Sequence, residues 1–325
     1  MIKKVLFITS FVVIFFTACG QKNKLNETKL EGLVFGTTYH ITYLDAKNHQ
    51  KPIDSLFYLV NKSLSTYMPT SDISKINKGD STVVIDDLFL EVFQKSKRIY
   101  KETNGYFDPT VCNLVNAWGF GYKREKKDLD SLAVHNLMQQ VGLDKVILKG
   151  RKIQKEFKTS CLDFNSIAKG YGIDVVGRFL ESKNIENYLV EIGGEIRARG
   201  KSKRNKNWKV AIDDPNSDGT RSVSRYIELD NQSMASSGNY RKFRIGVNGQ
   251  KYVHTINPKT GFATESNLLS ATVYGKVDCA DVDAYATAFM AMGLEKTKEF
   301  LVNHSQLKVV LLFFDEKGTL KMFSN

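Results

Sequence analysis

The amino-acid sequence predicts an α+β protein built from antiparallel hairpins with interspersed helices. Stretches rich in β-branched and aromatic residues come in neighbouring pairs, of which 243–247 and 250–256 flank Asn248 and Gly249. Both of these residues tolerate positive φ, so they suit a tight hairpin turn. Helical stretches lie between the pairs, but without the strict alternation that a doubly wound sheet requires. No repeat, low-complexity tract or linker follows about residue 30, so the 325 residues predict one large domain.

Each element is predicted from the spacing of its apolar residues or from its turn residues. Helices are expected where apolar side chains recur every three or four residues, and Gly105 and Gly142 are good C-terminal stops for two of them. In chain order the expected elements are strand 33–44, a helix around 56–64, helices 87–101 and 132–141, paired strands 145–148 and 152–157, helix 165–182, paired strands 188–192 and 196–200, the hairpin above, strand 268–274, helix 281–292, and paired strands 308–314 and 320–323.

The first residues are typical of an export signal. Lys3 and Lys4 precede an apolar stretch at 5–16, which is short for a membrane span. Small residues lead to Cys19, as in a bacterial lipoprotein signal, although Phe16 stands where Leu is usual. Cleavage is expected to leave Cys19 as a lipid-bearing N-terminus, and a plain secretion signal with a chance cysteine is the alternative.

The predicted organisation is therefore a signal peptide at 1–18, a lipidated tether at 19–30 and a catalytic domain at 31–325. It predicts a protein of the cell envelope that faces the periplasm. The membrane is expected to hold the protein through its N-terminal lipid.

The formal net charge of +12, from 47 basic and 35 acidic residues, on its own suits a nucleic-acid-binding protein. Export removes nucleic acid as the natural partner, and Lys3 and Lys4 leave with the signal. Two basic runs, at 123–127 and 201–206, lie between apolar stretches, where charged residues usually form solvated loops. The sequence therefore predicts no nucleic-acid partner.

Three cysteines remain after Cys19, namely Cys112, Cys161 and Cys279. An odd number excludes a complete set of disulfides, and no pair has CxxC spacing. A buried free cysteine is the expectation for all three.

Asp283 and Thr287 lie four residues apart on a predicted helix, so their side chains share one face. A carboxylate and a hydroxyl are hard oxygen donors that suit Mg²⁺ when substrate phosphates complete its coordination. The alternative is an exposed acidic helix start, in which Asp278, Asp281 and Asp283 favour the helix dipole. Spacing alone favours that alternative.

A second candidate begins the helix expected at 165–182. Asn165 and Ser166 are polar caps, Lys169 lies in the first turn, and such a helix start can hold an anion. Gly170 and Gly172 imply a close approach of something to the backbone, which is either a ligand or a tightly packed neighbouring element. Neither a Walker A nor a dinucleotide-binding glycine motif is present.

Three loops complete the candidates. His254 follows the central hairpin and could act as a general base near neutral pH, although a lone histidine at a strand end is more often structural. The loops 64–69 and 104–110 carry aromatic residues that could cover a planar ring or fold back into the core. No HxxxH or HExxH spacing indicates a zinc site.

Taken in order, these segments resemble the ApbE family of FAD:protein FMN transferases over nearly the whole mature chain, about 32–314. The resemblance depends on eight segments together, since no single one is specific. They are Phe35-Gly36-Thr37-Thr38-Tyr39, Ser65-Thr66-Tyr67, 105–110, 163–174, Ile192-Gly193-Gly194-Glu195, 236–240, 254–261, and 283–287 with Met292-Gly293.

The resemblance implies an envelope enzyme that splits FAD and attaches FMN, through its phosphate, to a Thr or Ser hydroxyl of a target protein, releasing AMP. Implied targets are flavoprotein subunits of the sodium-pumping NADH:quinone reductase and Rnf type. It also implies that His254 is the catalytic base and that Asp283, Thr287 and the backbone carbonyl of Ser166 bind Mg²⁺. The implied FAD contacts are Phe35, Tyr67, Tyr106, Phe107, Asp108, Asp163, Lys169 and Thr255.

Three positions depart from the family pattern. Phe35 stands where Met is common, and Tyr106 where Ala is frequent. Ala286 replaces a residue that is sometimes a second carboxylate, so the metal has one carboxylate ligand fewer. Two other functions therefore stay open: a Mg²⁺-dependent FAD pyrophosphatase that yields FMN and AMP, and a lipid-anchored FAD-binding protein without catalysis.

Overall fold

The computed structural model describes residues 26–122, 129–213, 222–239, 243–245, 251–263 and 267–325. Cys19, the predicted signal peptide and the basic run at 123–127 lie outside these residues. The second basic run forms an exposed loop after strand β6 (Glu195–Arg199), as expected. None of the helices in the described part of the chain is long and apolar enough to cross a bilayer.

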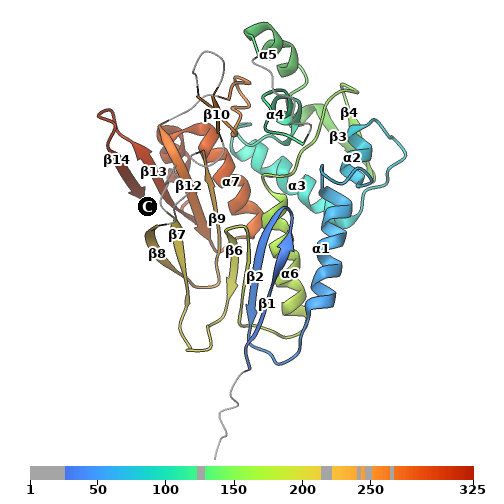
Figure 1. Cartoon of the computed structure of the whole chain (residues 1–325). Helices are drawn as coiled ribbons and strands as arrows, with labels where there is room; N and C mark the ends of the chain where they lie inside the picture. The colour runs from blue at the N-terminus through green and yellow to red at the C-terminus, as the bar shows by residue number, and fades with distance from the viewer. Residues whose placement is uncertain (1–25, 123–128, 214–221, 240–242, 246–250, 264–266) are drawn as a thin grey trace, which may run out of the picture.

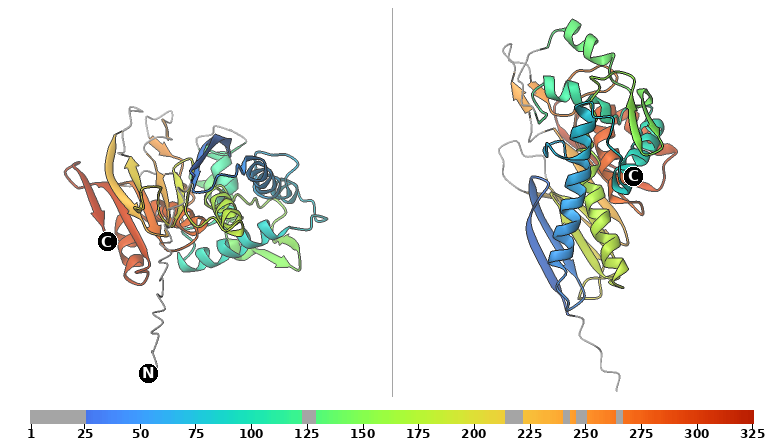
Figure 2. Two further views of the ribbon diagram at one scale, coloured as in Figure 1. Left: turned by 90° about the horizontal axis from the view of Figure 1, so that it is seen from below. Right: turned by 90° about the vertical axis from the view of Figure 1, so that its right-hand side faces the viewer.

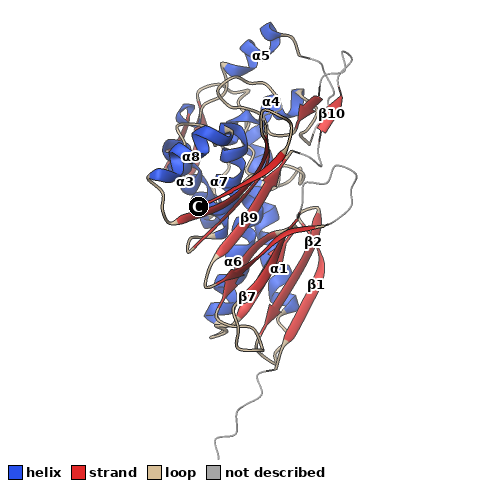
Figure 3. Ribbon diagram, turned by 90° about the vertical axis from the view of Figure 1, so that its left-hand side faces the viewer, coloured by secondary structure: helices blue, strands red, loops and turns tan. Residues whose placement is uncertain are grey.

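An eight-stranded sheet organises the fold, and each pair of neighbouring strands is antiparallel. Figure 3 shows the strands on one side and most helices on the other. The predicted α+β class with antiparallel hairpins is therefore confirmed. Across the sheet the strands are β1 (Thr28–Val34), β2 (Thr37–Tyr43), β5 (Tyr188–Ile192), β6, β9 (Ser233–Gly238), β12 (Leu268–Gly275), β13 (Leu307–Phe314) and β14 (Leu320–Ser324).

The expected strand at 33–44 is wrong, because the segment is a hairpin. β1 and β2 pair along their whole length, and Phe35 and Gly36 form the two-residue turn between them. Their φ values are 51° and 77°, which is the backbone shape of tight hairpin turns. Phe is uncommon at positive φ and common in strands, so Phe35 was expected in a strand and not in a turn.

Three helices cover the face of the sheet that carries the main core: α1 (Gln50–Leu64), α6 (Ala168–Ser182) and α7 (Cys279–Met292). α6 packs on β5 and β6, α7 packs on β9 and β12, and the two helices contact each other. Figure 2 shows α1 running beside α6 along the sheet. The N-terminal ends of α6 and α7 differ from the expected ones: α6 begins three residues later, after a turn at 165–167, and α7 begins two residues earlier.

The remaining elements surround the sheet and the helices packed on it (Figure 1). The hairpin β7–β8, which the sequence did not predict, covers part of the other face through a second apolar cluster around Trp208 and Leu229. A third cluster joins α4 and α5 to the segment after β11. The bounds are α2 (Asp72–Asn77), α3 (Asp87–Glu102), a 3-10 turn (Pro109–Val111), α4 (Cys112–Ala117), α5 (Ser131–Met138), a 3-10 turn (Leu143–Lys145), β3 (Val146–Lys149), β4 (Lys152–Lys155), β7 (Trp208–Asp213), β8 (Val223–Leu229), β10 (Phe243–Ile245), β11 (Lys251–Val253) and α8 (Leu294–Val302).

Candidate functional site

The segment 161–174 lies at the centre of the candidate site, because most of the other motifs contact it directly. It comprises the turn before α6 and the first half of that helix. Its partners come from β1–β2, the loop after α1, the loop after α3, the start of β6 and helix α7. Segments that are far apart in the sequence are thus brought to one end of α6.

Helices α6 and α7 touch through Gly170. A Cβ atom at this position would overlap the carbonyl group of Cys279 and the nitrogen of Ala280. Because the helices approach closely here, the Gly170 N–H also donates to Oδ2 of Asp283 at 3.0 Å. Gly172 likewise accommodates the ring of Phe35. Packing of neighbouring elements, the second of the two explanations offered above, therefore accounts for both glycines.

We expect Gly170→Ala to lower the free energy of unfolding by about 2 kcal/mol, a typical cost for forcing atoms into a packed contact. The overlap is with backbone, which cannot rotate away. Gly177→Ala in the same helix is the matched control, because it meets only side-chain atoms of Arg197 and Tyr188. Urea unfolding of the two variants measures the difference, and an equal cost for both would contradict the proposed backbone contact.

Asp283 is buried, not part of an exposed acidic helix start, so that alternative is wrong for this residue. Burial raises the pKa of its carboxyl group, while Lys169 and the Gly170 N–H act in the opposite direction. Thr287, one turn later on α7, lies 3.3 Å from the hydroxyl of Ser237 on β9. The structure thus places a carboxylate and a hydroxyl on one helix face next to the start of α6.

These donors fit a hard divalent cation that also binds substrate phosphates. Of the three predicted ligands, Asp283 could provide one carboxylate, Thr287 a hydroxyl, and Ser166 a carbonyl from the turn that precedes α6. Within the described residues, no group of three or more His, Cys, Asp or Glu side chains could hold a metal.

Lys169 lies in the first turn of α6, as predicted, and its side chain is about one-third exposed. Its ammonium group contacts Oε1 of Glu195 at 2.6 Å. Burial opposes the charge on Lys169, but Glu195 and Asp283 together raise its pKa. Ile167 precedes the helix without a capping side chain, so the expected polar cap at Asn165 and Ser166 is wrong. Within the first turn, the Ala168 N–H donates to the Phe164 carbonyl at 2.7 Å and the Gly170 N–H to the Asp283 carboxylate at 3.0 Å.

The loop after α3 contributes three of the predicted flavin contacts. Phe107 is buried in the main core, so it folds back into the protein. Tyr106 is partly exposed. Asp108 is buried and accepts hydrogen bonds from the N–H and hydroxyl of Thr110 at 2.8 and 2.6 Å. Burial raises the pKa of Asp108 to about 6.

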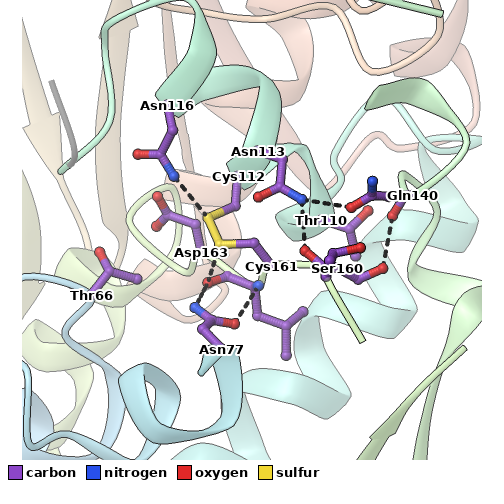
Figure 4. The surroundings of a disulfide bond; sticks show 12 residues. Thr66, Asn77, Thr110, Cys112, Asn113, Asn116, Gln140, Ser160, Cys161 and Asp163 are labelled. Carbon is purple, nitrogen blue, oxygen red and sulfur yellow. Dashed lines mark hydrogen bonds between the residues drawn. A yellow bond between two sulfur atoms is a disulfide. The ribbon is translucent and has the colours of Figure 1, made fainter. Parts of the chain in front are cut away.

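A disulfide joins Cys112 to Cys161, which corrects the expectation of three free cysteines (Figure 4). Only Cys279 is free among the cysteines that the structure describes, and it is buried. An odd number of cysteines excludes a complete set of bridges but allows one pair. The two partners meet, although 49 residues apart, because Asp163 N–H donates to the Pro109 carbonyl at 2.9 Å. The bridge thus connects the segments of Asp108 and Asp163.

Two further predicted contacts, Phe35 and Tyr67, belong to segments that touch the central segment. Phe35 packs edge-on against Phe57, with ring centroids 5.7 Å apart, and contacts Gly172. Tyr67 is 63% exposed, and its loop is tied to the turn before α6 because the Asn165 amide donates to the Thr66 hydroxyl at 3.3 Å. Burial raises the pKa of Asp163 in the same turn.

The segment 254–261 leads from β11 to a turn closed by the Gly261 N–H, which donates to the Asn257 carbonyl at 2.8 Å. His254 is partly buried. The Thr255 hydroxyl donates to the side chain of Asn239, which follows β9, at 2.9 Å. Lys259 lies 5.9 Å from the ring centre of Tyr106 and helps to line a cavity of about 280 Å³ that reaches Asp108. This segment therefore meets the loop after α3.

The sequence pattern pointed to no role for two buried carboxylates that lie next to these residues. Asp174 accepts the N–H groups of Cys279 and Ala280 at 2.9 and 2.8 Å, and so caps the start of α7. Arg197 contacts the same carboxylate at 2.6 Å, and burial raises the pKa of Asp174 to about 6. Glu195, the partner of Lys169, is the second. An acidic residue within an otherwise apolar stretch is a sequence signal that marks Asp174, whereas Glu195 lies between Glu191 and Arg197 and has no such signal.

Comparison with known proteins agrees with this geometry. Residues 35–311 match the model of the ApbE family. A protein of Haemophilus influenzae named FAD:protein FMN transferase is 36% identical over 317 residues, which cover 93% of this chain and 90% of that protein.

Two solved structures share the fold. The flavin transferase ApbE from Vibrio cholerae has a TM-score of 0.79 and 32% identity, covering 92% of this chain and 97% of that one. The apo flavinyl transferase ApbE from Pseudomonas stutzeri has a TM-score of 0.82 and 26% identity, covering 92% and 95%. The chain belongs to the ApbE family.

Proposed function

We propose that this protein is an FAD:protein FMN transferase that attaches FMN to a Thr or Ser hydroxyl of a target flavoprotein and releases AMP. The observation that carries the proposal is the convergence of the family motifs on the start of α6 and the face of α7 with Asp283 and Thr287. The similar proteins whose names state flavin transfer match nearly the whole chain, which supports the same activity here.

The proposed cation is Mg²⁺, held by Asp283, Thr287 and the carbonyl of Ser166. When bound, it neutralises charge on the pyrophosphate of FAD. The buried position of Asp283 suits this role, because an ionised carboxylate removed from water gains from a nearby cation. Ala286 supplies no second carboxylate, so further ligands would have to come from outside these three residues.

The protein's own groups contribute to catalysis by their position and charge, as is general in phosphoryl-type transfer. Lys169, in the first turn of α6, holds phosphate oxygens through its ammonium group. His254 takes the proton of the target hydroxyl, whose oxygen attacks the phosphorus on the FMN side. A new P–O bond joins FMN to the target, and the bond to AMP breaks. The other residues expected to contact FAD would place the flavin and the adenosine around this centre. The Phe107 side chain lies in the core, so its contact with FAD would have to come from its backbone.

The partners and the location are part of the proposal. The acceptor is a flavoprotein subunit of the sodium-pumping NADH:quinone reductase or Rnf type. Lipid on Cys19 anchors the enzyme to the membrane on the periplasmic side, and nucleic acid is no partner. Support comes from the signal-like first residues and the Cys112–Cys161 disulfide, since disulfides persist in oxidising compartments.

His254→Ala is expected to lower FMN transfer by about 10²–10⁴-fold, the usual contribution of a general base. FAD affinity should change little, because the side chain acts on the acceptor. Mass spectrometry of the acceptor and a fluorescence titration with FAD measure the two quantities. Transfer at the normal rate would remove His254 as the base.

One assay separates the proposed function from the two alternatives. The mature protein is incubated with FAD and Mg²⁺, with and without an acceptor domain, and the products are weighed. A transferase adds one FMN to the acceptor. A pyrophosphatase yields FMN and AMP equally well without it, and a binding protein leaves FAD intact.

A further inference from the structure

Glu195 is a buried carboxylate that the proposed chemistry leaves unused. It is the first residue of β6, directly after the Gly193-Gly194 turn, and only 3% of its surface is exposed. One of its oxygens, Oε1, contacts the ammonium group of Lys169 at 2.6 Å. Among the described residues, no hydrogen-bond partner reaches its second oxygen, Oε2.

Burying a carboxylate is costly unless charges and hydrogen bonds compensate for lost water. The charge of Arg197, two residues further along β6, is well compensated. Its guanidinium group contacts Asp174, Asp278 and the hydroxyl of Tyr188. Glu195 has a single cation and one oxygen without a partner, so its burial is poorly compensated. Burial accordingly raises the pKa of Glu195 to about 7, although Lys169 acts in the opposite direction.

A carboxylate buried at such a cost, with its one ion pair directed at a functional residue, indicates a role in the site rather than in stability. Lys169 projects from the first turn of α6, and its four-carbon side chain has several rotatable bonds. The contact with Glu195 on the neighbouring strand fixes where its charge lies. Without that contact, the ammonium group would be free to turn towards Asp283, which also attracts it.

We propose that Glu195 is a positioning residue that holds the Lys169 ammonium group where it meets the pyrophosphate of FAD. The inference rests on the proposed phosphate contact of Lys169. Glu195 itself touches no phosphate, because two negative groups repel. Its contribution to FAD binding therefore passes entirely through Lys169.

The test is a set of FAD titrations, followed by flavin fluorescence, on Glu195→Ala, Lys169→Met and the double variant. We expect Glu195→Ala to weaken FAD binding by about tenfold, as for loss of a hydrogen bond to a charged group. Lys169→Met should weaken it at least as much, and adding Glu195→Ala to it should change little. Glu195→Gln, which keeps an oxygen acceptor, should restore part of the affinity.

Riboflavin serves as a second probe, because it lacks phosphate. Its affinity should be the same in the wild-type protein and in Glu195→Ala, whereas a merely structural defect would weaken both ligands. Glu191→Ala is the matched control: it removes a carboxylate from the same β5–β6 hairpin, where Glu191 contacts His40 and the Gly194 N–H. FAD affinity should stay unchanged in this control.

The possible failures are distinguishable. If Lys169→Met binds FAD normally, the phosphate contact of Lys169 is wrong and the inference falls with it. If Lys169→Met binds weakly but Glu195→Ala binds normally, or if the two losses add in the double variant, only the role of Glu195 is overturned. Equal losses for riboflavin and FAD overturn it as well.

Discussion

Asp283→Asn is expected to lower FMN transfer by about 10²–10³-fold, the scale on which loss of one electrostatic group acts in such sites. Asn keeps the volume of Asp and an oxygen for the Gly170 N–H, so the contact between α6 and α7 is retained. The change removes the one carboxylate that the proposed cation site takes from α7. Mass spectrometry of the acceptor over time, at several Mg²⁺ concentrations, measures the loss.

How the transfer rate of Asp283→Asn depends on Mg²⁺ concentration is as informative as the size of the loss. If Asp283 binds the cation, higher Mg²⁺ should restore part of the activity of Asp283→Asn. Asp281→Asn is the matched control on the same helix, because Asp281 faces Lys95 and Arg98 and lies outside the site. Its transfer rate should stay near normal. An Asp283→Asn protein that transfers FMN at the wild-type rate would rule out Asp283 as a ligand.

Removal of the Cys112–Cys161 disulfide should produce the largest loss of stability among these variants. Chain-entropy arguments give about 4 kcal/mol for a bridge that closes a loop of this length. The double variant Cys112→Ala, Cys161→Ala avoids leaving one reactive thiol. Urea unfolding, compared with that of the oxidised wild-type protein, measures the change in free energy.

The same variant should bind FAD more weakly, because the bridge connects the loop of Asp108 to the turn of Asp163. A reducing agent added to the wild-type protein should reproduce both effects. The control is the reducing agent added to the double variant, where it should do nothing. Equal unfolding free energies for the oxidised protein and the variant would show that the bridge does not support the fold.

The class of fold and most strands were predictable, because alternation and turn residues are local signals. The hairpin β5–β6 and the terminal pair β13–β14 lie within one or two residues of their expected ends. The turn at Phe35 was missed because a bulky residue at positive φ has no local sequence signal. The hairpin β7–β8 was missed because the apolar cluster that supports it includes residues of β6, β9 and β13.

In the site too, local features were predictable from the sequence and long-range contacts were not. That Asp283 and Thr287 share a helix face follows from their spacing alone. That Asp283 is buried against Gly170, that Glu195 meets Lys169 and that Cys112 meets Cys161 depend on contacts across 113, 26 and 49 residues. No periodicity encodes such contacts, and the resemblance to a family supplied the roles of residues but not their partners.

The position of α7 has a consequence for how the protein is made. This helix packs against α6, β9 and β12, so a late part of the sequence fills the middle of the structure. A nascent chain that lacks residues 279–292 has neither Asp283 nor the backbone that Asp174 and Gly170 contact. Such long-range contacts form slowly, because distant segments must first meet. An N-terminal fragment that ends before residue 279 therefore lacks the site, which can form only late in synthesis.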